Sequence, residues 1–264
     1  MINSGYIKDK IELDHYVFGG GFIGDKKKVI KEDGQWTDDL PFEPQFKNNL
    51  ETYNCTTFNT LKPIQTIAKI QYDLNWNKSD RALGIFAGTK PPGNSPHKVS
   101  ETVRSQGLVD EDLLPWSDVI SSVDEYYSYA GGSAVECIKH ANKWLDEWDY
   151  MHEWVFKETD SVEVKQHKLK ESLKYSPLSI SVHAWKNENG LYYKTDFDED
   201  NHLTEIIGYV DGKYWICRDS YEPEEKHLAW NTNFGCAKVH FLFKRESPRI
   251  KENWLLALIK KLFI

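Results

Sequence analysis

Apolar residues recur at helical spacing in one segment of the first half of the chain. Phe58, Leu61, Ile64 and Ile67 follow one another at intervals of three residues, and this pattern predicts a buried helix that begins near Cys55. A thiol at a helix N-terminus lies at the positive end of the backbone dipole, which lowers its pKa. Cys55 is therefore a candidate nucleophile, although a lone intracellular cysteine is more often a small apolar core residue.

Other patterns in the first two thirds of the chain also predict helices. We expect a short helix over 97–106 that ends before Gly107, and a second over 161–174. Between them, Ser133 is a good N-cap, and the residues that follow favour one long helix over 133–157.

The last third of the chain changes to the period-two alternation that is typical of strands. Four such segments are predicted to be strands: 178–184, 202–209, 214–218 and 237–243. Asp211-Gly212, between the second and third of them, indicates a hairpin. A helical first half followed by antiparallel strands predicts an α+β fold with two lobes.

Length and charge narrow the function classes. The 264 residues suit one large domain or two closely packed subdomains. The net charge of −8 argues against nucleic acid as a partner, because phosphate binding depends on clustered Lys and Arg.

The four cysteines indicate a reduced protein. Cys55, Cys137, Cys217 and Cys236 lie far apart without CxxC spacing, so we expect neither a structural zinc ion, nor a disulfide framework, nor a cofactor. The N-terminus lacks the apolar core of a signal peptide, and no apolar run is long enough to span a bilayer. These features predict a cytoplasmic or other reducing intracellular location.

Four segments, taken together and in this order, resemble the papain-like (cathepsin-type) cysteine peptidases. Lys47-Asn48-Asn49 before Cys55 is similar to the family's loop before its nucleophile, and Phe58 falls where the family has Phe. The other three segments are Gly107-Leu108-Val109 through Pro115-Trp116, Asn201-His202-Leu203 through Gly208-Tyr209, and Tyr214 through Asp219-Ser220-Tyr221. His202 lies 147 residues after Cys55, within the family's interval of roughly 130–150.

The resemblance implies a role for each matched residue. Cys55 would be the thiolate nucleophile, His202 the general acid, and Asp219 the group that orients the imidazole. The Cys55 N–H and the Asn49 amide would form the oxyanion hole, and Tyr221 would shield the His202–Asp219 pair. The implied reaction is peptide-bond cleavage in a peptide or protein substrate through a thioester acyl-enzyme.

The resemblance also implies an architecture. A helical N-terminal lobe would carry the nucleophile helix, and a C-terminal lobe would hold an antiparallel, barrel-like sheet. The peptidase domain would span 36–245, between an N-terminal extension over 1–35 and an amphipathic tail over 246–264. Residues 250–264 are apolar enough to need a partner, and we weigh docking on the domain itself against a partner protein or a membrane surface.

Several positions depart from the family's pattern. The family's Gln is Asn49 here, and its triad Asn is Asp219. The Trp that follows the family's nucleophile is Thr56, and the Trp that shields its His–Asn pair is Tyr221. Two alternatives therefore stay open: a papain fold kept for binding or assembly with weakened catalysis, and a Cys–His amidase that acts on peptidoglycan peptides.

Overall fold

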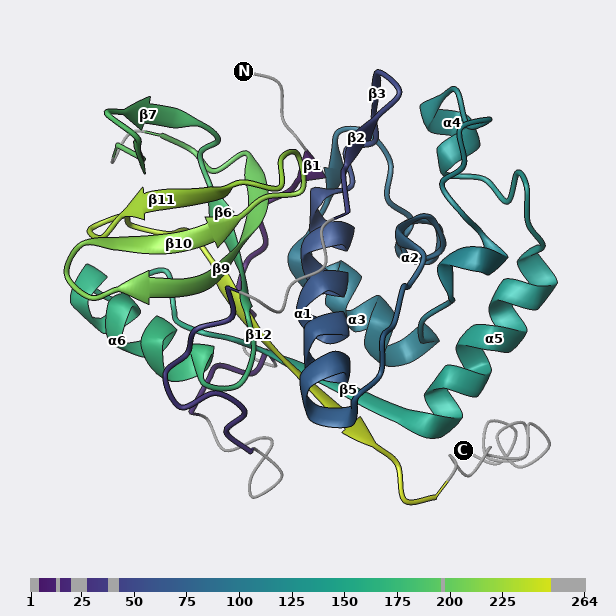
Figure 1. Ribbon diagram of the computed structural model, residues 1–264, viewed down its shortest axis with the longest axis horizontal. Coiled ribbons are helices and arrows are strands. Elements are labelled where there is room, and N and C mark those ends of the chain that lie inside the picture. Colours follow the sequence, from purple (N-terminus) through teal and green to yellow (C-terminus); the bar gives the residue numbers. More distant parts are fainter. Residues whose placement is uncertain (1–4, 13–14, 20–27, 38–42, 196–197, 248–264) are drawn as a thin grey trace, which may run out of the picture.

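The helix predicted to begin near Cys55 stands at the centre of the molecule (Figure 1). In the computed structural model this helix, α1, spans Cys55–Tyr72 and separates the remaining N-terminal helices from a large sheet. The structure describes residues 5–12, 15–19, 28–37, 43–195 and 198–247. The predicted α+β fold of two lobes is confirmed.

Serine side chains begin the other long helices of the described chain. Their hydroxyl groups accept a hydrogen bond from a first-turn N–H, which satisfies a donor that has no partner within the helix. The helices that start in this way are α2 (Asp80–Ala87), α3 (Pro96–Gln106), α5 (Ala134–Glu147) and α6 (Val162–Leu173). The short helix α4 (Val123–Tyr126) also starts with a serine N-cap. A 3-10 turn lies at Glu111–Leu113.

The second lobe is built on an eight-stranded sheet with the order β5-β12-β6-β9-β10-β11-β8-β7. Its neighbouring strands are antiparallel except for β8 and β11. The strands span Trp148–Trp154 (β5), Leu178–Val182 (β6), Lys186–Glu188 (β7), Leu191–Tyr193 (β8), His202–Val210 (β9), Tyr214–Arg218 (β10), Glu225–Ala229 (β11) and Ala237–Lys244 (β12). The four predicted strands correspond to β6, β9, β10 and β12, and Gly212 takes the positive φ that the predicted hairpin requires.

Two short strand pairs complete the fold. Strands β1 (Gly5–Tyr6) and β4 (Gly93–Asn94) pair in parallel, and β2 (Phe46–Lys47) pairs with β3 (Leu50–Glu51) in a hairpin. Figure 1 shows β1 beside the N-terminal end of α1, with the β2–β3 hairpin projecting beyond that end.

The long helix predicted over 133–157 is wrong in its second half. Helix α5 ends at Glu147, and the next seven residues form β5, which pairs with β12 along its whole length. Trp148, Tyr150 and Trp154 lie at even positions and are all buried. Pairing with a buried neighbouring strand therefore overrides the local helical preference.

Strand β12 contributes to the cores of both lobes. Val239 and Phe241 pack with the apolar side chains of β6, β9 and α6, whereas Leu242 packs with Leu61 and Ile64 of α1. The two lobes therefore share a strand at the end opposite β1, as Figure 1 shows.

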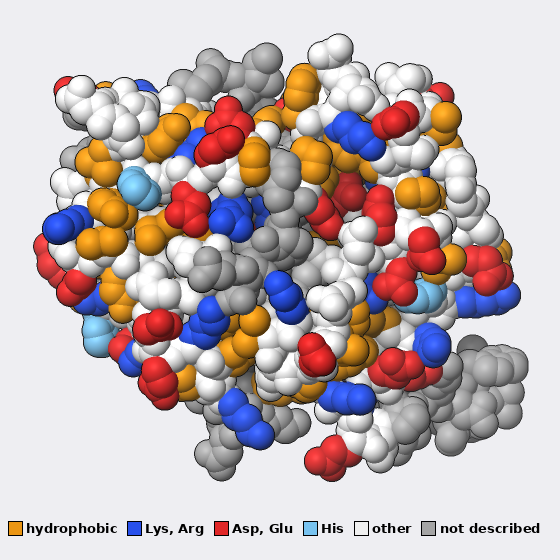
Figure 2. Space-filling view, viewed as in Figure 1, with side chains coloured by type: hydrophobic (Ala, Val, Ile, Leu, Met, Phe, Trp, Pro, Cys, Tyr) orange, Lys and Arg blue, Asp and Glu red, His pale blue; other side chains and the backbone are white. Residues whose placement is uncertain are grey.

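The surface carries charges of both signs. Figure 2 shows acidic and basic side chains interspersed over the face seen in Figure 1. Within the described ranges, no helix has the length and apolar character needed to cross a bilayer. The predicted tail over 246–264 lies outside the described residues from residue 248 onward, and its partner stays a prediction.

Candidate active site

Cys55 is the first residue of α1, as predicted. The N-cap residue Asn54 turns its side chain away from the helix and donates to the Asp80 carbonyl and the Tyr126 hydroxyl. The Leu203 N–H, one residue after His202, donates to the Cys55 thiol over 3.4 Å. The thiol therefore lies directly against the strand that carries the candidate acid.

The β9–β10 hairpin brings His202 and Asp219 together. His202 begins β9, Asp219 follows β10, and His202 Nε2 lies 2.7 Å from Asp219 Oδ1. The Ser220 N–H donates to the same oxygen over 2.7 Å. His202 Nδ1 is buried and has no hydrogen-bond partner among the described residues. One ring nitrogen is thus held, and the other is available to a thiol.

The Asp219 carboxyl stays ionised in this buried position. Burial opposes its ionisation, but the charge and hydrogen bond of His202, together with the charges of Lys226 and Lys62, outweigh it and hold the pKa of Asp219 below its usual range. The carboxylate can therefore orient the imidazole and stabilise its protonated form.

Asn59 was not predicted, yet it links the two halves of the site. It lies one helical turn after Cys55, and its amide donates to the Cys55 carbonyl over 2.8 Å and to the Leu203 carbonyl over 2.6 Å. The first bond runs within α1 and the second crosses to β9. This side chain fixes the nucleophile helix against the strand of His202.

Aromatic rings enclose the imidazole, as the sequence predicted for Tyr221. The Tyr221 ring centroid lies 5.4 Å from that of His202, and Trp185, which was not predicted, lies edge-on at 5.9 Å. Cys55, His202 and Asp219 each have 0% of their surface exposed. His202 and Asp219 are therefore paired, Cys55 contacts the residue that follows His202, and all three side chains are buried.

The β2–β3 hairpin places Asn49 away from the oxyanion hole that was expected for it. Asn48 and Asn49 form its two-residue turn with φ of 55° and 62°, a conformation that asparagine tolerates better than most residues. Asn49 is exposed at the tip of the hairpin. Because this turn lengthens the loop before Cys55, counting six residues back from the cysteine leads to the wrong side chain.

A different amide, that of Gln45, lies at the site. Gln45 is fully buried; its side-chain oxygen accepts from the Ser220 hydroxyl over 2.9 Å, and its backbone N–H donates to the Ser220 carbonyl. Its Nε2 donates to Tyr221 Oη and to the Glu51 carboxylate over 3.0 and 2.9 Å. In the described state this amide is thus occupied by a carboxylate of the neighbouring hairpin.

Strand β1 packs against the loop that precedes Cys55. Gly5 packs so closely that a Cβ there would lie 2.3 Å from the Tyr53 carbonyl oxygen, two residues before Cys55. Tyr6 is buried in one apolar cluster with Cys55 and Leu203. The Ile7 N–H donates to the Asn94 carbonyl over 2.9 Å. The chain's own N-terminal segment therefore packs beside the N-terminal end of α1, in the same apolar cluster as the thiol.

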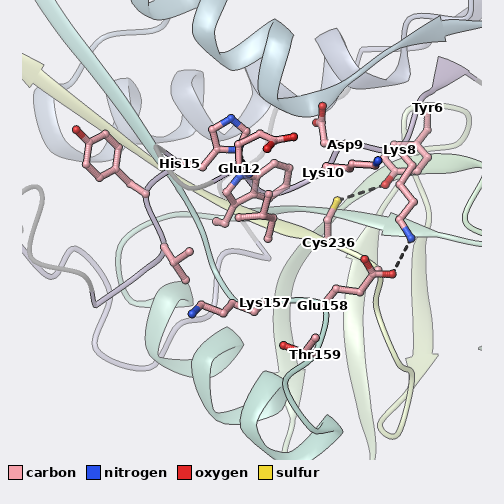
Figure 3. A pocket seen from close by; sticks show the side chains of 15 residues that line it. Tyr6, Lys8, Asp9, Lys10, Glu12, His15, Lys157, Glu158, Thr159 and Cys236 are labelled. Carbon is pink, nitrogen blue, oxygen red and sulfur yellow. Dashed lines mark hydrogen bonds and ion pairs between the residues drawn. The ribbon is translucent and has the colours of Figure 1, made fainter.

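Polar contacts hold this segment in place, and Figure 3 draws two of them, Tyr6 with Cys236 and Lys8 with Glu158. Asp9 accepts from the His97 N–H over 2.9 Å, and the rings of His15 and His97 stack at 3.7 Å. The Tyr6 hydroxyl contacts the Cys236 sulfur at 3.7 Å. Between the segment, Trp154 and the Lys157–Thr159 turn lies a cavity of about 670 Å³.

Burial changes the acidity of the Cys55 thiol. Burial raises the pKa of the Cys55 thiol above its ordinary value, and the Leu203 N–H opposes this effect only in part. The sequence had predicted a lowered pKa from the helix N-terminus. Removal of water from the thiol therefore outweighs the helix dipole in this structure.

Two buried charged groups lie behind the site. Lys62 of α1 donates to the Asp219 carbonyl over 3.2 Å, and its pKa is lowered by burial. Burial also raises the pKa of Glu205 to about 8, and neither of its carboxylate oxygens has a hydrogen-bond partner within the described chain. Burial therefore disfavours the charged form of each group.

Replacing Glu205 by glutamine is expected to stabilise the protein, and to do so more strongly as the pH rises. The folded-state pKa of Glu205, about 8, lies above the ordinary value, so above about pH 4.3 the unfolded chain releases a proton that the folded chain keeps. The contribution of this carboxyl to stability is thus complete below that pH and is lost as the pH rises through 8. Urea unfolding at pH 5 and pH 8 measures the difference, with the exposed Glu188→Gln as control. A gain in stability that is equal at both pH values would contradict the assignment.

Two solved structures illustrate what this chain resembles. Procathepsin L 3 from the larval midgut of Tenebrio molitor matches with a TM-score of 0.59 and 14% identity, over 90% of this chain and 76% of that one. The proform of Amb a 11, a cysteine protease and major ragweed pollen allergen, matches with a TM-score of 0.56 and 13% identity, over 81% and 67%. No protein-family model and no curated protein sequence matches the chain.

The fold is that of the papain-like cysteine proteases. This confirms the family resemblance at the level of the fold, including the helical and β lobes on either side of the nucleophile helix. At these identities the comparison carries no residue roles.

Proposed function

We propose that the protein is a thiol hydrolase that cleaves peptide bonds through Cys55, His202 and Asp219. The observation that carries the proposal is the state of the His202 ring, whose Nε2 is held by Asp219 while Nδ1 is buried and free beside the strand position that contacts the thiol. A Cys–His pair oriented by a third group is the arrangement that activates a thiol.

In the proposed reaction, the Cys55 proton passes to His202 Nδ1 and the thiolate attacks the substrate carbonyl carbon. A C–S bond forms, and the carbonyl electron pair moves to the oxygen. That pair then returns, the C–N bond breaks, and the imidazolium gives its proton to the leaving amine. Water, deprotonated by the neutral imidazole, hydrolyses the thioester, releases the carboxylic acid and restores the thiol.

For the oxyanion we propose the Cys55 N–H and the Gln45 amide in place of Asn49. Gln45 is buried and fixed through Ser220, the residue that follows Asp219. To serve in this way, its Nε2 must release the Glu51 carboxylate, so the described state corresponds to a closed form. Loss of one such donor costs roughly 3–4 kcal/mol of transition-state stabilisation.

The second candidate, a papain fold kept for binding, has its own support. Cys55 is completely buried, and the amide proposed for the oxyanion already has two partners. Under this alternative β1 would be a permanent part of the core. Under the hydrolase proposal it would be a displaceable cover.

Labelling of the full chain with an epoxysuccinyl probe across pH 4–9, read by mass spectrometry, tests the hydrolase proposal. All four cysteines are free and buried, Cys55 included, so any of them reacts only after local opening. The hydrolase proposal predicts modification at Cys55 alone, with an onset well below the free-thiol value of about 8.5, because opening exposes the thiol beside His202. An onset near that value, together with no cleavage of casein, would favour the binding alternative. Cleavage of peptidoglycan fragments but not of casein would identify the amidase instead.

A further inference from the structure

Position 219 carries a charge that the resembled peptidases lack. Where they have a neutral asparagine, this chain has an aspartate whose carboxylate is fully buried. A carboxylate away from water is costly unless hydrogen bonds and an opposite charge compensate it. The structure provides both, and it divides them between the two oxygens of Asp219.

Oδ1 receives the groups expected of a triad. His202 Nε2 and the Ser220 N–H both lie 2.7 Å from it. Oδ2 faces a different pair, the Trp185 indole N–H at 2.9 Å and the Lys226 ammonium at 3.6 Å. The extra charge is therefore met on the side away from the imidazole.

Lys226 is held at this position by its surroundings. It lies on β11, and only 5% of its side chain is exposed. Its Nζ stands over the Trp185 ring at 5.3 Å and the Tyr192 ring at 6.0 Å, and it also pairs with Glu222 at 2.9 Å. Glu222 is 62% exposed, so its charge is screened by water more than that of Asp219.

We propose that Lys226 is a positioning residue for the peptidase reaction, acting through Asp219. Its cation offsets the charge that aspartate adds at this position, so that the carboxylate orients His202 without retaining the proton that the ring must give to the leaving amine. The inference rests on the proposed function, but its effect on the ring can be measured without any substrate.

Other groups that face the pair do not replace Lys226. Lys62 donates to the main-chain carbonyl of Asp219, not to its carboxylate, and burial lowers its pKa. Of the remaining titratable or charged neighbours, Arg218 pairs with Glu225. The others are acids, thiols and phenols, which cannot supply a positive charge: Glu51, Cys55, Tyr192, Glu205, Cys217, Tyr221 and Glu222.

The test is the titration of the His202 ring, followed by NMR in the full chain. In Lys226→Met the midpoint is expected to rise by about one pH unit, because the imidazolium then faces an uncompensated carboxylate. Lys226→Arg should restore the parent midpoint. Lys170→Met is the matched control, since Lys170 also pairs with an aspartate and stands over two aromatic rings, but it lies on α6 and makes none of these contacts with Asp219. If the Met variant does not fold, Lys226→Gln takes its place.

Asp219→Asn shows whether the effect passes through the carboxylate. In that background, Lys226→Met should no longer move the midpoint, whereas a purely structural lysine would act equally in both. An unchanged midpoint in Lys226→Met, or the same shift in both backgrounds, would overturn the inference. If the midpoint moves while the parent cleaves no peptide bond, Lys226 still acts on the His202 ring through Asp219, but the proposed function fails and with it the role of Lys226 in that reaction.

Discussion

Replacing Gly5 by valine is expected to increase the alkylation rate of Cys55 by at least about tenfold, because reactivity of a covered thiol follows the free energy of local opening. Gly5 has a φ of 111°, and any Cβ would overlap the Tyr53 carbonyl. Strand β1 must then leave its place between β4 and the loop before Cys55. With β1 displaced, water reaches the thiol and the burial that raises its pKa is relieved.

The control for this variant is Gly19→Val. Gly19 also has a positive φ, 87°, but a Cβ there meets nothing within 4 Å. It therefore reproduces the backbone strain without the overlap. Iodoacetamide labelling measures the rates, and circular dichroism checks that the fold survives. Equal rates in the two variants would mean that β1 does not limit access to Cys55, and a gain of hydrolysis only in Gly5→Val would favour the hydrolase over the binding protein.

In the opened Gly5→Val protein, His202→Ala is expected to lower peptide hydrolysis by a factor on the order of 10⁴ or more. The substitution removes the acceptor of the thiol proton and the donor to the leaving amine in one step. Labelling of Cys55 should persist, but with its onset moved up towards the free-thiol value of about 8.5. Activity on peptide amides and the labelling profile together measure both effects.

His167→Ala serves as the control for this second variant. His167 lies exposed on α6, across the sheet from the site. Its loss should leave both readouts unchanged. If hydrolysis survived in His202→Ala, the assignment of the general acid would be wrong, whatever the effect of Gly5 on access.

The positions of Cys55, His202 and Asp219 in the fold could be predicted from the sequence because local patterns mark the elements that carry them. The apolar spacing after Cys55 gives the helix, and the alternation around Asp211-Gly212 gives the hairpin that joins His202 to Asp219. Each signal lies within about a dozen residues. The structure then needed only to bring a helix N-terminus against the start of a strand.

The parts that were missed depend on pairing over long distances or on small insertions. Strand β1 has two residues, and its partner β4 lies 88 positions away, so no local pattern indicates it. The family's six-residue interval before the cysteine does not lead to Gln45, because the β2–β3 hairpin adds residues to this loop. Asn48-Asn49 between Phe46-Lys47 and Leu50-Glu51 does have the composition of a hairpin turn.

Other features leave no mark in the sequence at all. The burial of Lys62, Glu205 and Lys226 follows from the lobes that close over them, because charged residues are by default exposed. In β5, by contrast, a signal was present. Its buried aromatic residues alternate with period two, but they follow a helical pattern that continues into them.

Strand β12 sets a limit on how the molecule can move. Its side chains belong to the cores of both lobes, and it pairs with β5 from end to end. The lobes therefore cannot swing apart about a linker, as two domains joined by a hinge would. We expect amide protons of β12 to exchange only on global unfolding, whereas those of Gly5–Ile7 exchange through local detachment. On this view, a peptide would reach Cys55 through the local detachment of strand β1, while the rest of the protein stays folded.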